Sequence, residues 1–158
     1  VASASDDGTV RLWAAGRGAD EEAQTFRREA TIMCGAQATS LAWDARSERI
    51  LLLGTDGGNI RAWDADAKKM VFDASSPLPV VRSMAAAQDG ASFVVAAHDQ
   101  AALESCLNVY AMRDGRSTSR FTVPDGSCIT CLHLNHNGSL LASGCGVDGT
   151  VRIFDVRS

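Results

Sequence analysis

Four side chains that could bind zinc lie close together near the end of the sequence: Cys128, Cys131, His133 and His136. A structural zinc site needs four such ligands arranged as a tetrahedron around the ion. The surrounding residues predict a strand, in which successive side chains alternate between two faces, so Cys128 and Cys131 are expected to point apart. His136 falls in the following turn. The spacing therefore argues against a metal site, and we favour thiols packed between sheets.

A dinucleotide-binding pattern, G-x-G-x-x-G, is matched letter for letter by residues 144–149. These glycines bind a pyrophosphate only where a helix begins directly after them. Residues 150–154 are instead β-branched and alternate in polarity, which predicts a strand. We therefore expect the glycines to form a turn, and we expect no nucleotide cofactor.

Adjacent carboxylates occur at Asp6-Asp7 and at Asp20-Glu21-Glu22. A catalytic pair must be held at a fixed separation around a substrate. The first pair falls in a predicted hairpin turn, and the second falls in residues 14–24, which we predict to be a solvated loop. Nucleophile-elbow, H-E-x-x-H and P-loop patterns are absent. We predict a protein that is not an enzyme and that uses no metal or cofactor.

Composition narrows the class of protein further. The 158 residues carry a net charge of −4, with a pI of about 5.3, which disfavours binding to nucleic acid. No apolar run approaches the roughly 18–20 residues that cross a bilayer. The cysteines are five in number and irregularly spaced, which favours free thiols in a reducing, cytoplasmic compartment.

A seven-residue pattern recurs along the chain, and repeats of this kind define an architecture. Asp-Gly-Thr-Val-Arg-Leu-Trp at 7–13 returns as Asp-Gly-Thr-Val-Arg-Ile-Phe at 148–154, with weaker copies between them. The copies end at Trp13, Trp63, Tyr110 and Phe154, which are 50, 47 and 44 residues apart. Blades of four-stranded propellers repeat at about 40–45 residues.

Strands are predicted between these copies from short apolar runs divided by turn signals. The expected strands are 1–5; 38–43, 80–85 and 128–134; 50–55, 92–97 and 140–143; and, at the outside, 68–74 and 117–124. Arg11, Arg61 and Arg152 occupy one repeat position, which we interpret as structural. We interpret His98 as a strand-end histidine bonded to backbone rather than as a pH switch.

The recurring segment resembles the WD repeat, with an acidic residue after the aromatic in Trp63-Asp64 and Phe154-Asp155. The resemblance implies an all-β fold: a partial WD-repeat β-propeller of about three and a half four-stranded blades, with repeats at approximately 1–33, 34–74, 75–124 and 125–158. Such a segment leaves open sheet edges, so we expect it to be a piece of a larger propeller. The Gly-His pair usual in the family is missing, which leaves its Asp–His network without the usual histidine.

Two stretches are similar to the C-terminal propeller of the WD repeat-containing protein 91 family. The first combines residues 51–54, 67–69 and 90–94, and the second combines Phe121 with residues 135–141 and 148–155. This resemblance implies an endosomal adaptor that binds a late-endosomal Rab GTPase. It also implies restraint of phosphatidylinositol 3-kinase complexes during early-to-late endosome conversion, on the cytosolic face of early and late endosomes and with peripheral membrane association. The alternative is a generic assembly scaffold, such as a ubiquitin-ligase substrate receptor or a chromatin-binding propeller, because one fold hosts many functions.

Propellers bind proteins at the mouth of the central channel, which is lined by the first residues of each innermost strand. In this sequence those positions are Gln37, Thr39, Val80, Arg82, Cys128 and Thr130. Arg82 is the only charged residue among them. We predict that it pairs with a carboxylate of a partner, since Arg is enriched at interface hot spots. The alternative is that Arg82 is simply solvated.

Overall fold

The computed structural model describes residues 1–17, 24–123 and 128–156, and every regular element in them is a β-strand. The strands of the first two sheets are β1 (Ala2–Ala4), β2 (Thr9–Arg17), β3 (Gln24–Met33), β4 (Ala38–Trp43), β5 (Ile50–Thr55), β6 (Asn59–Asp64) and β7 (Lys69–Ser75). Those of the last two are β8 (Val80–Ala86), β9 (Ser92–Asp99), β10 (Glu104–Ala111), β11 (Ser117–Val123), β12 (Ile129–Leu134), β13 (Leu140–Cys145) and β14 (Val151–Asp155). No helix that could span a bilayer occurs in the described part of the chain.

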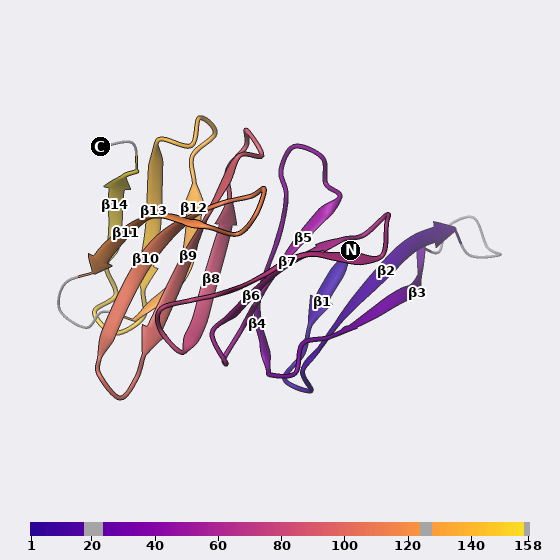
Figure 1. Ribbon diagram of the computed structural model, residues 1–158, viewed down its shortest axis with the longest axis horizontal. Coiled ribbons are helices and arrows are strands. Elements are labelled where there is room, and N and C mark those ends of the chain that lie inside the picture. Colours follow the sequence, from indigo (N-terminus) through magenta and orange to yellow (C-terminus); the bar gives the residue numbers. More distant parts are fainter. Residues whose placement is uncertain (18–23, 124–127, 157–158) are drawn as a thin grey trace.

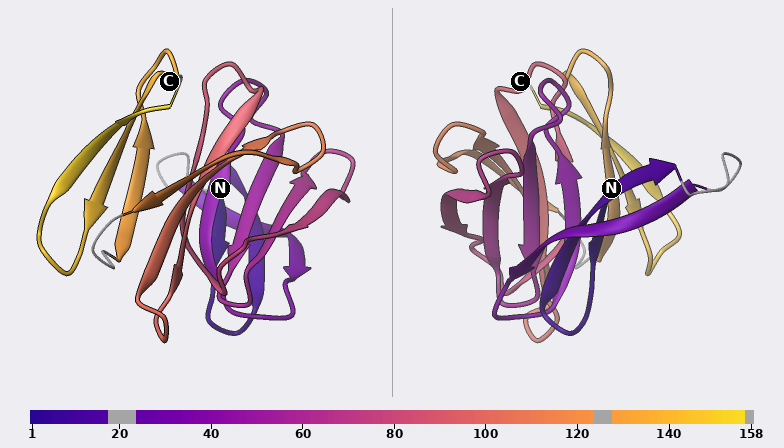
Figure 2. Two further views of the ribbon diagram at one scale, coloured as in Figure 1. Left: turned by 60° about the vertical axis from the view of Figure 1, so that its left-hand side comes forward. Right: turned by 90° about the vertical axis from the view of Figure 1, so that its right-hand side faces the viewer.

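Four antiparallel sheets follow one another along the chain, and in each of them strands adjacent in sequence are hydrogen-bonded neighbours. The orders are β1-β2-β3, β4-β5-β6-β7, β8-β9-β10-β11 and β12-β13-β14. The sheets lie side by side in chain order (Figure 1), and the two turned views show that they are inclined to one another (Figure 2). Adjacent sheets contact one another through β4, β8 and β12, the first strands of the last three sheets. The all-β, propeller-type expectation is therefore confirmed.

The hydrophobic core lies between the sheets rather than within a single layer. Leu52, Val81 and Tyr110 belong to the cluster that joins the second and third sheets. Within that cluster Phe93 stacks on Tyr110, with ring centroids 5.3 Å apart, and on Phe72, with centroids 6.0 Å apart. The middle strands are apolar on both faces because each is covered by a sheet on either side, as the fully buried run Leu51–Leu53 shows.

The first sheet corrects one expectation. Residues 14–17, predicted as part of a loop, extend β2, and they pair with the beginning of β3, where no strand was predicted. The polar residues Arg27, Arg28 and Glu29 are exposed in β3, so this outer strand lacks the apolar alternation that identifies strands from sequence. Its ladder with β2 supplies the backbone hydrogen bonds. Asp20-Glu21-Glu22 lie outside the described residues.

A β-bulge interrupts the first strand of each of the last three sheets at the same place. The register shifts between Ala38 and Ser40 in β4, between Val81 and Ser83 in β8, and between Ile129 and Cys131 in β12. A bulge places two residues of one strand opposite one residue of its partner, which leaves the extra residue outside the ladder. The extra residues are Thr39, Arg82 and Thr130, which therefore occupy one equivalent position in three sheets.

Candidate protein-binding face

The residues predicted to line the channel mouth gather at one end of the sheets, where β4, β8 and β12 begin. We call this end the channel face. The three bulged residues lie on it, and each is preceded two positions earlier by another predicted residue: Gln37, Val80 and Cys128. Gln37, Arg82 and Thr130 are exposed. The six residues thus occupy two equivalent positions in each of three sheets, and their binding role stays a prediction.

Two of the bulged side chains fold back onto backbone. The Thr39 hydroxyl donates to the carbonyl oxygen of Val81 at 2.5 Å and lies 3.1 Å from that of Gly54. The Thr130 hydroxyl donates to the carbonyl oxygen of Gly144 at 3.3 Å. Each of these threonines therefore uses its single donor within the fold.

Arg82 differs from its two counterparts. Its side chain is exposed and forms no hydrogen bond or ion pair with any residue that the structure describes. The backbone on both sides is held by neighbouring sheets, because Val81 accepts the Thr39 hydrogen bond and the Ser83 hydroxyl accepts one from the Leu132 amide at 3.1 Å. A guanidinium on a fixed backbone offers a planar fork of donors that fits a carboxylate.

The other recurring arginines are used within the fold. Arg11 pairs with Asp7 at 2.7 Å, Arg152 with Asp148 at 3.1 Å, and Arg61 with Asp73 at 2.9 Å. Their interpretation as structural residues is confirmed. Arg61 turns to another strand because glycine stands where Asp7 and Asp148 stand in the other copies.

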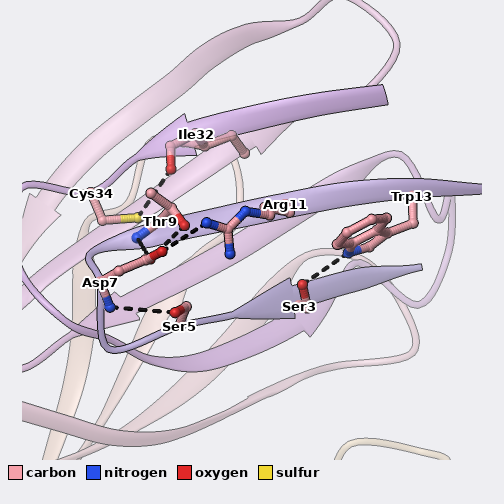
Figure 3. A network of polar contacts seen from close by, with 8 residues as sticks. All are labelled: Ser3, Ser5, Asp7, Thr9, Arg11, Trp13, Ile32 and Cys34. Atoms are coloured by element: carbon pink, nitrogen blue, oxygen red, sulfur yellow. Dashed lines mark hydrogen bonds and ion pairs between the residues drawn. The ribbon is translucent and has the colours of Figure 1, made fainter. Parts of the chain in front are cut away.

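The turn before β2 shows how the repeated Asp is held (Figure 3). Its carboxylate accepts hydrogen bonds from the Thr9 hydroxyl at 2.6 Å and from Arg11 at 2.7 Å. The Thr9 hydroxyl and then Arg11 hold the pKa of Asp7 well below its usual range. The matching hydrogen bonds from the Thr150 side chain and amide lower the pKa of Asp148 to about 2. Each carboxylate is therefore engaged as an anion within its own turn.

The cysteine–histidine segment does not form a cluster. Cys131 and His133 are exposed on one face of β12, while the Cys145 thiol donates to the Cys128 carbonyl oxygen at 3.4 Å. Cys128 precedes β12, and the bulge at Thr130 interrupts the strict alternation from which opposite faces were predicted. Within the described ranges, no group of three or more His, Cys, Asp or Glu side chains could hold a metal ion. After the glycines of residues 144–149, β14 follows, as predicted.

His98 has a different partner from the one expected. Its Nδ1 lies 2.8 Å from the Ser105 hydroxyl oxygen, and both side chains are buried, so the interpretation as a backbone-bonded histidine was wrong. The sequence concealed this pair because residues 99–105 match the repeat poorly. That segment forms a longer β9–β10 hairpin. The sequence feature that could have indicated it is the apolar triplet at 101–103.

Comparison with known proteins places these features in a family. The WD domain, G-beta repeat family matches residues 1–14 and 115–155. WD repeat-containing protein 91 homolog of Dictyostelium discoideum is 32% identical over all of this chain and 20% of its own length. WD repeat-containing protein 91 of Danio rerio is 33% identical over 99% of this chain and 23% of its own length.

A solved structure shows the same fold. The crystal structure of the C-terminal WD40 domain of Sif2 superimposes with a TM-score of 0.75 and 19% identity over 98% of this chain and 42% of that chain. The chain spans about a fifth of the length of the curated relatives it matches. Over residues 1–14 and 115–155 it therefore matches the WD-repeat family, and over its whole length it is similar to proteins named WD repeat-containing protein 91.

Proposed function

We propose that the chain forms part of a non-enzymatic, protein-binding scaffold whose binding surface is the channel face, with Arg82 at its centre. The observation that carries this proposal is the contrast between Arg82 and its two equivalents. Thr39 and Thr130 are engaged by backbone, whereas Arg82 is exposed and unpaired among the described residues, on a strand fixed from both sides. Because the backbone is already held, only the Arg82 side chain has to be ordered on binding, and its guanidinium suits a carboxylate of a partner protein.

We further propose that the scaffold is an endosomal adaptor on the cytosolic face of early and late endosomes. In this role it binds a late-endosomal Rab GTPase and restrains phosphatidylinositol 3-kinase complexes during endosome conversion. Support comes from the resemblance of residues 51–54, 67–69, 90–94, 135–141 and 148–155 to the WD repeat-containing protein 91 family, and from similarity to its members over the whole chain. The second candidate is a scaffold for another assembly, since the fold alone does not select a partner.

The test is a pull-down with the full-length protein and the late-endosomal Rab GTPase, loaded with GTP or with GDP. Binding that prefers the GTP form, and that weakens in Arg82→Ala, supports the adaptor and its face. Arg116→Ala is the matched control, because this exposed arginine lies in the turn after β10, at the opposite end of the sheets. Absence of binding by the folded protein in either nucleotide state would exclude this GTPase and leave the second candidate.

A further inference from the structure

The hairpin of β9 and β10 is longer than its counterparts. Glu104, where β10 begins, lies six residues before the aromatic Tyr110. In the second sheet Asn59 begins β6 only four residues before Trp63, and β2 likewise begins four residues before Trp13. The third sheet is therefore extended by two residues on each strand at the channel face. Figure 1 draws this turn at the lower end of the sheets, where β8 also begins.

Side-chain interactions hold the extension in one conformation. His98 and Ser105 are cross-strand partners in the ladder and form the buried 2.8 Å hydrogen bond. Asp99 accepts hydrogen bonds from the amides of Ala101 and Ala102 at 2.9 and 3.2 Å. On the other strand, Glu104 pairs with Arg120 of β11 at 3.0 Å. These interactions hold in place the hairpin that carries residues 101–103, which we call the tip.

The tip itself is apolar, although turns at a surface are usually polar. Ala101, Ala102 and Leu103 are all exposed, and Leu103 is 67% exposed. Leu103 also adopts φ of +53°, a region that a bulky residue seldom occupies and that Gly or Asn enters more readily. An exposed leucine in this conformation contributes neither packing nor a relaxed turn to the fold.

The tip lies next to the channel mouth. His98, at the base of the extension, is paired with Val80, which begins β8 two residues before Arg82. An exposed leucine in the β9–β10 turn therefore shares one four-stranded sheet with Arg82 of β8, a cation that has no partner among the described residues. A partner segment that bears an apolar side chain near a carboxylate would match both.

We propose that Leu103 and Arg82 form a two-point site for an acidic peptide segment of a partner protein: its apolar side chain packs on Leu103, and its Asp or Glu pairs with Arg82. This proposal rests on the protein-binding function assigned to the channel face. A protein is favoured over an anionic membrane because residues 99–104 include no Lys or Arg, the residues that attract a protein to anionic headgroups.

The experiment selects a random-peptide phage library on the full-length protein and measures the affinity of the enriched peptides. The expected peptides combine an aliphatic or aromatic residue with Asp or Glu. Leu103→Asn should weaken them about tenfold while raising the thermal midpoint, because Asn accepts the left-handed conformation. Lys68→Asn is the control, since Lys68 has φ of +51° in the turn before β7 at the opposite end, and it should leave peptide affinity unchanged.

Each of the following results would contradict the two-point site of Leu103 and Arg82. Peptides that lose affinity in Arg82→Ala but bind Leu103→Asn as tightly as wild type would overturn the role of the hairpin and leave the proposed function standing. Failure to enrich acidic–apolar peptides would also overturn the two-point site, while the GTPase pull-down tests the function separately. Vesicles containing phosphatidylserine that bind wild type but not Leu103→Asn would reassign the tip to a membrane.

Discussion

The Thr39 hydroxyl donates a hydrogen bond to the carbonyl oxygen of Val81, 2.5 Å away on the first strand of the next sheet. Thr39 is the bulged residue of β4, and Val81 immediately precedes the bulged residue of β8. Bulges disrupt the ladder locally, so backbone groups beside them need other partners. One threonine side chain thus satisfies a backbone group in the neighbouring sheet and fixes the position of Arg82.

Thr39→Val is expected to lower the free energy of unfolding by about 1–2 kcal/mol. Valine keeps the shape of the side chain but removes the donor, which leaves the Val81 carbonyl oxygen without this partner. Thr39→Ser, which keeps the hydroxyl, is the control and should retain most of the stability. Denaturant unfolding of the full-length protein measures both, and equal stability of the valine variant and wild type would contradict the link between sheets.

Gly54→Ala is expected to destabilise the same junction. A Cβ at position 54 would lie 2.4 Å from Cγ1 of Val81 and 3.3 Å from Cε of Met84, so β5 and β8 would have to separate. Overpacking of this kind costs about 1–3 kcal/mol. Gly16→Ala is the matched control in another strand, because its Cβ would meet nothing nearer than 3.7 Å. Similar thermal midpoints for the two variants would show that the sheets do not meet as described.

Much of this architecture could be predicted from the sequence, since apolar runs and repeated aromatics mark buried strands directly. β4 and β5 were predicted with the bounds they have. The outer strand β3 was missed because its exposed charges carry no periodic signal, and the partner of His98 was missed because it lies in an irregular insertion. Bulges leave no mark in composition either. Residue types alone therefore did not distinguish Arg82, which has no partner in the described part of the chain, from Thr39, whose hydroxyl is bonded to backbone.

Arg82 variants should change binding without changing stability. Because the side chain is exposed and unpaired among the described residues, Arg82→Ala should leave the thermal midpoint within experimental error. It should lower the affinity for an acidic partner about tenfold. Arg82→Lys should restore little of that affinity, since an ammonium cannot donate through a planar fork. Calorimetric titration with an acidic peptide measures all three proteins, and full rescue by lysine would indicate charge attraction alone.

Stability should fall in acid as the turn carboxylates become protonated. The pKa of Asp148 is lowered from 3.8 to about 2, and that of Asp7 is also lowered. A depressed pKa in the folded state adds stability above the unfolded pKa of about 4, and this is lost as pH falls towards 2. Asp7→Asn should flatten the dependence of stability on pH between 4 and 2. Stability curves that run parallel for this variant and wild type, followed by circular dichroism, would refute this origin of the acid sensitivity.

The two repeated tryptophans should respond differently to loss of the indole N–H. Trp13 Nε1 donates to the Ser3 hydroxyl at 2.9 Å, whereas the buried Trp63 Nε1 has no hydrogen-bond partner among the described residues. The cause is a substitution, because the register places Leu53 opposite Arg61 where Ser3 lies opposite Arg11.

A double-mutant cycle isolates the hydrogen bond from the change in ring size. Trp13→Phe and Ser3→Ala should show a coupling of about 1 kcal/mol in the free energy of unfolding. For Trp63→Phe, removal of an unsatisfied buried donor should partly offset the loss of packing, so its cost should fall below the roughly 3–5 kcal/mol of a full aromatic truncation. No coupling at Ser3–Trp13 would mean that this hydrogen bond contributes nothing net to the stability of the fold.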